Sequence, residues 1–309
     1  MTERPVVPTT APSFPIRLIA LDIDGTLVDD GLTIGPRTLE AVKTAMDRDV
    51  AVSLLTGRMV SSGMRFAETL GLSGPVIGYQ GGLIRAMPEA GSTRLGKLLL
   101  HTPLPGSVAQ EIVLWTREHG LDPHLNHLER FIVRADDPLA EDYSAFMGHR
   151  AELVADLVAA AATRPATKVM AVGEPPLPTE LAPLARAHFA GRADVTVSHP
   201  KYLEFVAPGV SKGRAIRWLA RRLGVPLGST LAIGDQWNDL EMIAEVGHGA
   251  AMPTAPDEVR AVARYIAPSV EDEGPAQLIE GLVLASPSDA LAASRRMEAD
   301  ALERRAATA

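Results

Sequence analysis

The sequence predicts an α/β fold, a doubly wound parallel sheet that carries an inserted α+β module. Two observations support the sheet: short apolar runs alternate with stretches of helical periodicity, and this alternation stops near residue 82 and resumes near residue 210. A third observation supports the insertion. Between the two halves, strand pairs and helices occur together, which is typical of an α+β module.

The first half contains three expected strands and two expected helices. Leu18–Leu21 is an apolar run that reads as a buried strand. Pro36 suits the first turn of a helix, and apolar residues at helical spacing extend that helix to Arg48. The remaining elements are a strand at Val50–Leu55, a helix at Met59–Leu70 that ends at Gly71, and a strand at Pro75–Tyr79.

The insertion and the second half are assigned in the same way. The insertion is expected to hold a turn-rich stretch at Gly82–Gly96, a helix at Gly106–His119, a strand pair at Leu121–Asn126 and Arg130–Arg134, helical stretches at Ala140–Gly148 and Ala151–Ala161, a strand at Lys168–Val172, a helix at Pro178–Phe189, and a hairpin at Val195–Ser198 and Tyr202–Val206. After it we expect helices at Lys212–Leu223, Trp237–Val246, Asp257–Ala263 and Gly274–Val283, and strands at Thr230–Ile233, Gly249–Met252 and Tyr265–Ala267.

These elements divide the chain into expected domains. Residues 16–82 and 209–285 form the sheet domain, and residues 83–208 form the inserted α+β module. Residues 1–15 are rich in Pro and Thr and are expected to be a flexible leader. The tail, residues 286–309, is rich in Ala, Arg and Glu, and both a helix and disorder are consistent with that composition.

Composition restricts the class of protein. A chain of 309 residues is long enough for about two domains. The net charge of −8 disfavours a nucleic-acid partner, which requires a basic surface. The absence of cysteine excludes disulfides, thiolate catalysis and Cys-based zinc sites, and it fits a cytoplasmic protein. No apolar run approaches the roughly 20 residues that span a bilayer, so no membrane partner is expected.

Two carboxylates follow the first strand. Asp22 and Asp24 are two residues apart, so in an extended segment they point the same way and repel each other. A divalent cation with oxygen ligands, most simply Mg²⁺, would relieve that repulsion. The alternative is a polar strand end followed by a turn.

Two further motifs could hold a phosphoryl group. Thr56 and Gly57 offer a hydroxyl and backbone N–H groups at the start of a helix, although Thr56 is equally suited to be an N-cap. Arg58, beside them, could anchor a substrate or pair with a carboxylate. Lys212 also begins a helix, where a cation is unfavourable unless an anion accompanies it. The alternative for Lys212 is an ordinary solvated surface lysine.

The last motif follows the strand at Thr230–Ile233. Asp235 can complete a metal site, and Asn238 and Asp239, one helical turn on, can orient ligands or Lys212. A turn followed by an N-cap is the alternative reading. Because the motifs all fall at the carboxyl ends of predicted strands or at the starts of helices beside them, we expect them to share one edge of the sheet, where open α/β sheets bind ligands.

The segments DIDGTL, TGR, SKG and GDQWND resemble the four signature motifs of the haloacid dehalogenase superfamily. The insertion resembles the type IIB cap of its Cof-like phosphatase branch, and the resemblance extends from about Arg17 to Val283. It implies a Mg²⁺-dependent phosphoric monoester hydrolase that acts on small phosphorylated metabolites, most simply sugar phosphates. A phosphomutase of the same superfamily and a non-catalytic metabolite-binding protein are the alternatives.

The resemblance also implies a role for each residue. Asp22 would be the nucleophile that forms an aspartyl-phosphate, and Asp24 the general acid and base. Thr56, Gly57, Lys212 and Asn238 would bind the phosphoryl group. Asp22, the backbone carbonyl of Asp24, and Asp235 would bind Mg²⁺, with Asp239 and Arg58 in support.

Two positions depart from the pattern of that branch. Gln80-Gly81-Gly82 stands where Asn-Gly-Ala is usual, and Pro253-Thr254 stands where Gly-Asn is usual. These departures affect the expected substrate and cap closure and leave the metal chemistry unchanged. Two histidines of the insertion, His124 and His127, are expected to be partly exposed or to contact substrate, with metal ligation as the alternative.

Overall fold

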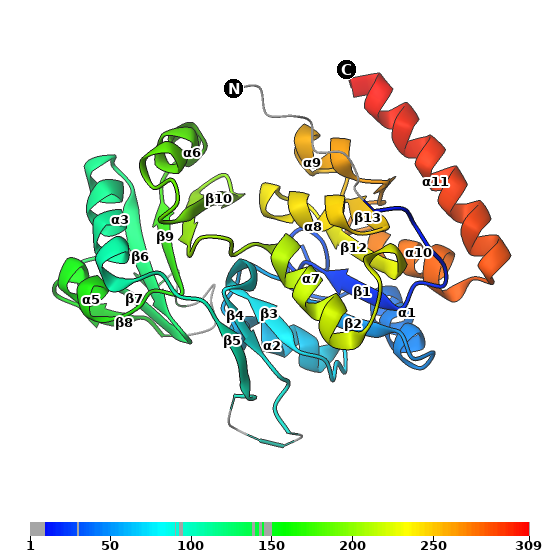
Figure 1. The fold of residues 1–309 in the computed structure, drawn as a ribbon, viewed down its shortest axis with the longest axis horizontal. Helices are drawn as coiled ribbons and strands as arrows, with labels where there is room; N and C mark the ends of the chain where they lie inside the picture. The colour runs from blue at the N-terminus through cyan, green and yellow to red at the C-terminus, as the bar shows by residue number, and fades with distance from the viewer. Residues whose placement is uncertain are drawn as a thin grey trace. The chain divides into compact units, whose positions relative to one another are not determined.

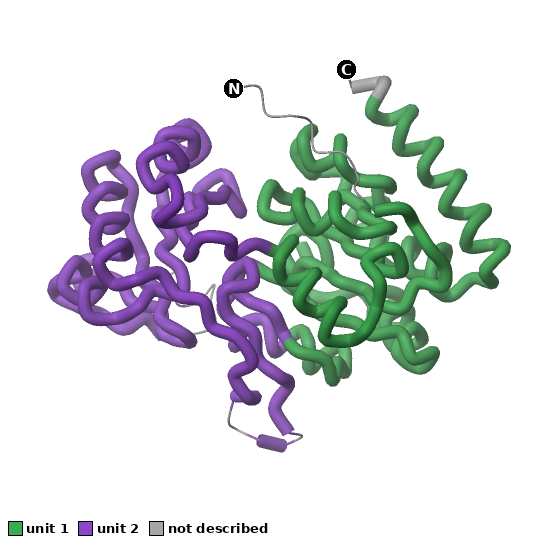
Figure 2. The backbone as a smooth tube through the Cα atoms, viewed as in Figure 1, with its two compact units in different colours: residues 1–56, 66–75, 212–309 green, residues 57–65, 76–211 purple. Residues whose placement is uncertain are grey.

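The structure is a computed structural model that describes residues 10–29, 31–89, 91–92, 95–137, 140–141, 144 and 150–308. The chain divides into two compact units, which Figure 2 distinguishes by colour. The first unit comprises Met1–Thr56, Phe66–Pro75 and Lys212–Ala309, and the second comprises Gly57–Arg65 and Val76–Ser211.

The first unit is built on a five-stranded sheet in the order β14-β13-β12-β1-β2 (Figure 1). All neighbouring strands pair in parallel. This arrangement confirms the predicted α/β fold with a parallel sheet, because apolar runs buried on both faces suit such strands. The strands are β1 (Leu18–Leu21), β2 (Ala51–Leu54), β12 (Thr230–Gly234), β13 (His248–Ala251) and β14 (Tyr265–Ile266).

Helices connect these strands and bury their apolar faces. In α7, Ala215, Ile216 and Leu219 recur at helical spacing and are buried. The helical elements of the first unit are α1 (Pro36–Met46), α7 (Lys212–Leu223), η2 (Leu227–Ser229), η3 (Trp237–Asp239), α8 (Leu240–Glu245), α9 (Asp257–Val262), α10 (Gly274–Ile279), η4 (Glu280–Leu284) and α11 (Pro287–Thr308). The helix α2 (Val60–Thr69) begins in the second unit and ends in the first.

The tail forms the long helix α11, which packs on the first unit. The Tyr265 hydroxyl in β14 and the Ser294 hydroxyl in α11 lie 2.7 Å apart and are both buried. Arg264 forms an ion pair with Glu298 of the same helix. Within the described residues, we find no helix that combines the length and apolar character required to cross a bilayer.

The third strand is where the expected topology is wrong. β3 (Val76–Gly78) does not extend the parallel sheet but pairs antiparallel with β4 (Leu83–Arg85) in the second unit. The short helix η1 (Tyr79–Gly81) reverses the chain between them. β5 (Leu98–His101) completes this three-stranded sheet, and both β4 and β5 fall in or next to the stretch that was expected to hold only turns.

A six-stranded sheet in the order β10-β11-β9-β6-β7-β8 fills the rest of the second unit. Every neighbouring pair is antiparallel except β7 and β8. The strands are β6 (Asp122–His127), β7 (Arg130–Arg134), β8 (Glu152–Val154), β9 (Lys168–Val172), β10 (Asp194–His199) and β11 (Tyr202–Val206), and the helices are α3 (Gly106–Glu118), α5 (Leu157–Thr163) and α6 (Leu177–His188).

The helix expected at Ala151–Ala161 begins later than predicted. Glu152–Val154 is instead β8, and the helix starts after Asp156, whose side chain accepts a hydrogen bond from the Ala159 N–H and caps it. The helix expected at Ala140–Gly148 lies largely outside the described residues.

Candidate active site

The centre of the first unit's sheet carries a buried three-residue charge cluster. Asp22 directly follows β1, Lys212 opens α7, and Asp239 lies in η3 after β12. The Lys212 Nζ lies 2.8 Å from the Asp22 Oδ1 and 2.7 Å from the Asp239 Oδ1. Lys212 is fully buried, so it is not the solvated surface lysine that the sequence left open. Its anionic partners also explain a cation at a helix start.

Electrostatics bind this cluster together. Burial alone would lower the pKa of Lys212, but the carboxylates of Asp22 and Asp239 raise it above its usual range. Burial also raises the pKa of Asp22 well above its usual value, and the charge of Asp239 adds to that shift while Lys212 opposes it. Lys212 therefore stays protonated, and one ammonium is shared between two carboxylates.

A third buried carboxylate lies beside them. Asp235 follows β12, and one oxygen each from Asp22, Asp235 and Asp239 lie within 4.8 Å of one another. Burial, followed by the charge of Asp239, raises the pKa of Asp235 to about 7. The charge of Asp24 raises the pKa values of both Asp22 and Asp235, so Asp24 also acts on this cluster.

These residues fit a divalent cation. Three carboxylates face a single ammonium, so the cluster carries excess negative charge when they are ionised. The Oδ1 of Asp235 is buried and makes no hydrogen bond among the described residues, which leaves an oxygen available as a ligand. Hard divalent cations prefer carboxylate oxygens. The cluster is therefore a candidate site for a divalent metal.

Backbone hydrogen bonds hold the loop that carries Asp235. The Asp239 Oδ2 accepts hydrogen bonds from the N–H groups of Asp235 (3.1 Å) and Gln236 (3.2 Å). Asp239 therefore pairs with Lys212 through one oxygen and fixes the loop through the other. Asn238 lies in the same short helix, η3, and the neighbouring Trp237 packs against the apolar cluster that α8 and α9 bury.

Two glycines, Gly25 and Gly234, allow the backbone to lie close to the Asp235 and Asp239 side chains. Sequence reasoning did not identify this role. At Gly25, φ is +70°, and an added Cβ would lie 2.3 Å from the Asp235 Oδ2. At Gly234, an added Cβ would lie 2.3 Å from the Asp239 Cγ. A Cβ at either position would force the neighbouring Asp side chain to move, and the positive φ at Gly25 adds backbone strain. Their place beside the acidic residues of DIDGTL and GDQWND was the available signal.

Thr56 follows β2, the strand next to β1, and is fully buried. The Leu55 N–H donates to the Leu21 carbonyl (2.9 Å), which continues the pairing of the two strands to the residue before Thr56. Gly57 and Arg58 fall in the second unit. There the Gly57 carbonyl accepts a hydrogen bond from Lys168, and the buried Arg58 side chain lies 3.5 Å from the Ser62 hydroxyl.

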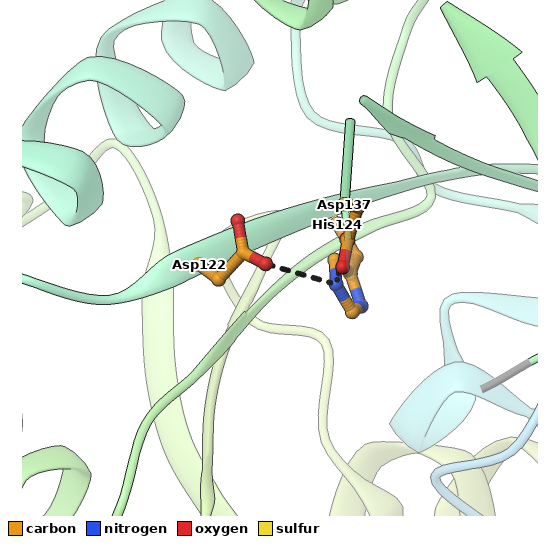
Figure 3. A group of neighbouring side chains, drawn as sticks. All are labelled: Asp122, His124 and Asp137. Atoms are coloured by element: carbon orange, nitrogen blue, oxygen red, sulfur yellow. Dashed lines mark hydrogen bonds and ion pairs between the residues drawn. The ribbon is translucent and has the colours of Figure 1, made fainter. Parts of the chain in front are cut away.

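His124 belongs to a separate group in the second unit, shown in Figure 3. Its Nε2 lies 3.0 Å from the Asp137 Oδ2 and 3.9 Å from the Asp122 Oδ2. His124 is fully buried, so the expectation of partial exposure was wrong for this residue. The hydrogen bond to Asp137 accounts for the burial of the imidazole. Burial, followed by the charge of Asp137, raises the pKa of Asp122.

Comparisons with a family model and with known sequences agree with one another. A family model described as haloacid dehalogenase-like hydrolase matches residues 19–279. A Streptococcus pyogenes protein with a provisional phosphatase name is 31% identical over 277 residues, which cover 87% of this chain and 99% of that protein. The HMP-PP phosphatase of Serratia proteamaculans is 30% identical over 253 residues, which cover 80% of this chain and 87% of that enzyme.

A solved structure shares the fold. The crystal structure of a haloacid dehalogenase-like hydrolase from Bacteroides thetaiotaomicron superposes with a TM-score of 0.73 at 25% identity. The match covers 86% of this chain and 99% of that structure.

Proposed function

This chain belongs to the haloacid dehalogenase-like hydrolases, and we propose that it is a Mg²⁺-dependent phosphatase of small phosphorylated metabolites, with sugar phosphates as the expected class. The observation that carries the proposal is the shared ammonium of Lys212, which lies 2.8 Å from Asp22 beside two further buried carboxylates. The relative named HMP-PP phosphatase supports a small phosphorylated substrate.

Asp22 is the proposed nucleophile. Its carboxylate oxygen attacks phosphorus, the bond from phosphorus to the ester oxygen breaks, and Asp24 donates a proton to the departing oxygen. In the second step, Asp24 takes a proton from water as the water oxygen attacks the same phosphorus. The bond from phosphorus to Asp22 then breaks, which releases inorganic phosphate and restores both carboxyl groups.

The remaining residues bind and orient. Lys212 holds Asp22 in place through their ion pair and supplies a positive charge for the phosphoryl oxygens. Thr56, Gly57 and Asn238 are proposed to bind the phosphoryl group, and Arg58 is proposed to support them. Asp239 positions Lys212 and the backbone of Asp235. Bound Mg²⁺ would be held by Asp22, Asp235 and the backbone carbonyl of Asp24, and it would neutralise charge on the transferring group.

The direct test is hydrolysis of an aryl phosphate by the purified full-length chain, with Mg²⁺ and with EDTA. We expect turnover that requires the metal. Absence of turnover under both conditions would favour a non-catalytic binding protein. A panel of phosphorylated metabolites would then identify the substrate, and an isomerised product formed only with a bisphosphate would favour a phosphomutase instead.

A further inference from the structure

The second unit buries an ion pair between two strands of its six-stranded sheet. The Lys168 Nζ in β9 lies 2.6 Å from the Glu204 Oε1 in β11, and both side chains are 2% exposed. Glu204 pairs opposite Met170, two residues from Lys168, so the two charges share one face of the sheet. A buried ion pair is often no more stabilising than apolar side chains of similar size. Its other hydrogen-bond partners therefore indicate its role better than stability does.

Both members of the pair have a second partner. The Lys168 Nζ also donates to the Gly57 carbonyl at 2.9 Å. The Gln80 Nε2 donates to the Glu204 Oε2 at 2.7 Å. One continuous chain of hydrogen bonds therefore runs from Gln80 through Glu204 and Lys168 to Gly57, and all its side chains are buried. Buried hydrogen-bond networks of this kind favour a single arrangement of their members.

Gln80 itself is held in an unusual conformation. Tyr79 and Gln80 have φ values of 51° and 60°, so two consecutive residues other than glycine adopt the left-handed region. Such strain persists only where surrounding contacts hold it. The amide of Gln80 also lies against Gly57, where an added Cβ would be 2.6 Å from the Gln80 Nε2.

The segment after Gly57 has two more anchors within the same unit. The Arg58 carbonyl accepts a hydrogen bond from the Tyr79 N–H at 2.9 Å. The Ser61 N–H, in the first turn of α2, donates to the Glu129 Oε2 at 3.1 Å. The backbone of this segment is therefore held at three points by the strands and turns around it.

We propose that Lys168, Glu204 and Gln80 are positioning residues that fix the peptide between Gly57 and Arg58. A peptide is planar, so a carbonyl held by Lys168 also sets the direction of the Arg58 N–H. The functional consequence rests on the proposed phosphatase function, in which Thr56 and Gly57 bind the phosphoryl group. The Gly57 N–H belongs to the preceding peptide, and fixing the next peptide restricts rotation at Gly57 and with it the direction of that N–H. This positioning also gives a role to Gln80, whose side-chain amide donates to Glu204.

The test compares a double variant with a matched control. Lys168→Met/Glu204→Gln removes both charges together, so no unpaired buried charge remains. The control, Lys201→Met/Glu174→Gln, makes the same changes in an exposed ion pair of the same unit. Gln80→Asn is a second variant that leaves the ion pair in place and withdraws the amide from Glu204.

Two readouts separate positioning from general stability. For the double variant and for Gln80→Asn, we expect faster hydrogen exchange in residues 57–65 and unchanged exchange in the other strands of the second unit. We also expect kcat for an aryl phosphate to fall about tenfold with little change in KM, the effect of losing about one hydrogen bond at the transition state. The control should match the wild type in both readouts.

Unchanged exchange in residues 57–65 together with wild-type kcat would overturn the proposal. If the double variant does not fold, Gln80→Asn decides by the same criteria. If the wild type hydrolyses no phosphate ester, the phosphatase proposal fails by itself. The exchange measurement then decides alone whether these residues position the Gly57 peptide.

Discussion

Lys212 and Asp22 form a 2.8 Å ion pair that joins the start of α7 to the end of β1. The same ammonium reaches Asp239 at 2.7 Å, so one cation holds two carboxylates in the buried centre of the first unit. This relationship places a positive charge against the proposed nucleophile. Asp235 lies beside them, and one of its oxygens makes no hydrogen bond among the described residues. That oxygen is therefore available as a metal ligand.

Gly25→Ala tests whether the turn after β1 must approach Asp235 closely. The added Cβ would lie 2.3 Å from the Asp235 Oδ2, so we expect Mg²⁺ affinity, measured by calorimetric titration, to fall at least about tenfold. Gly71→Ala is the control, because Gly71 has nearly the same φ, +69°, and no atom within 4 Å of the added Cβ. Gly71→Ala should lose about 1–2 kcal/mol of stability through backbone strain, and Gly25→Ala should lose at least as much because of its added contact. Equal Mg²⁺ affinities in both variants would contradict this account.

The pH dependence of metal binding tests the state of Asp235. Its pKa is raised to about 7 by burial and by Asp239, so the metal must displace a proton below that pH. We expect the apparent Mg²⁺ affinity to fall about tenfold per pH unit below pH 7 and to level off above it. Calorimetric titrations across this range measure the effect. A flat profile would contradict the combination of a raised Asp235 pKa and metal ligation by Asp235.

The raised pKa of Asp235 also predicts how the stability of the metal-free protein depends on pH. Between the ordinary value of 3.8 and about 7, the folded Asp235 binds a proton that the unfolded chain has released. The contribution of Asp235 to the free energy of unfolding is therefore complete at low pH and is lost as the pH rises through this window. Urea unfolding should show that Asp235→Asn removes this slope. An unchanged slope in the variant would contradict the shift.

Lys212→Met removes the shared cation. Asp22 and Asp239 would then be buried without their partner, so we expect a loss of about 3–5 kcal/mol of stability near neutral pH. Turnover of an aryl phosphate should fall at least about 100-fold. Arg217 lies on the same helix as Lys212 and forms a partly exposed ion pair with Glu245 of α8, so Arg217→Met should change stability by no more than about 1 kcal/mol. Similar losses in both variants would argue against a special role for Lys212.

The environment of His248 predicts that acid lowers the stability of the protein, independently of the active site. Burial lowers its pKa to about 4. Its Nδ1 lies 2.9 Å from the Tyr265 hydroxyl and its Nε2 lies 3.1 Å from the Ser13 carbonyl oxygen, both within hydrogen-bond distance. As the pH falls from 6.5 to 4, the unfolded chain binds a proton that the folded protein does not, so stability is lost by up to about 1.4 kcal/mol per unit. His248→Gln should flatten this slope in urea unfolding. The same slope in the variant would refute the assignment.

The parallel sheet could be predicted because its strands are buried on both faces. Runs such as Leu18–Leu21 and Thr230–Gly234 are apolar throughout, and helical spacing separates them. The direction of β3 could not be predicted in this way. It depends on the left-handed conformations of Tyr79 and Gln80, which local preference disfavours and which contacts distant in the sequence hold.

The candidate site was predictable for a related reason. Asp22 and Asp235 follow neighbouring strands, and Lys212 starts a helix at the same edge, so topology brings them together. Their catalytic roles stay predictions. The role of Gly25 depends on a distance between two loops, and the burial of His124 depends on Asp137, which comes from another segment. Neither follows from spacing along the chain.

Turnover of an aryl phosphate by Asp22→Asn, measured with saturating Mg²⁺ and compared with the wild type, tests the central claim most directly. The change preserves the size of the side chain and removes the attacking carboxylate, so we expect at least about a thousandfold loss of kcat while thermal unfolding shows an intact fold. A folded Asp22→Asn protein that retains the wild-type rate would contradict the account.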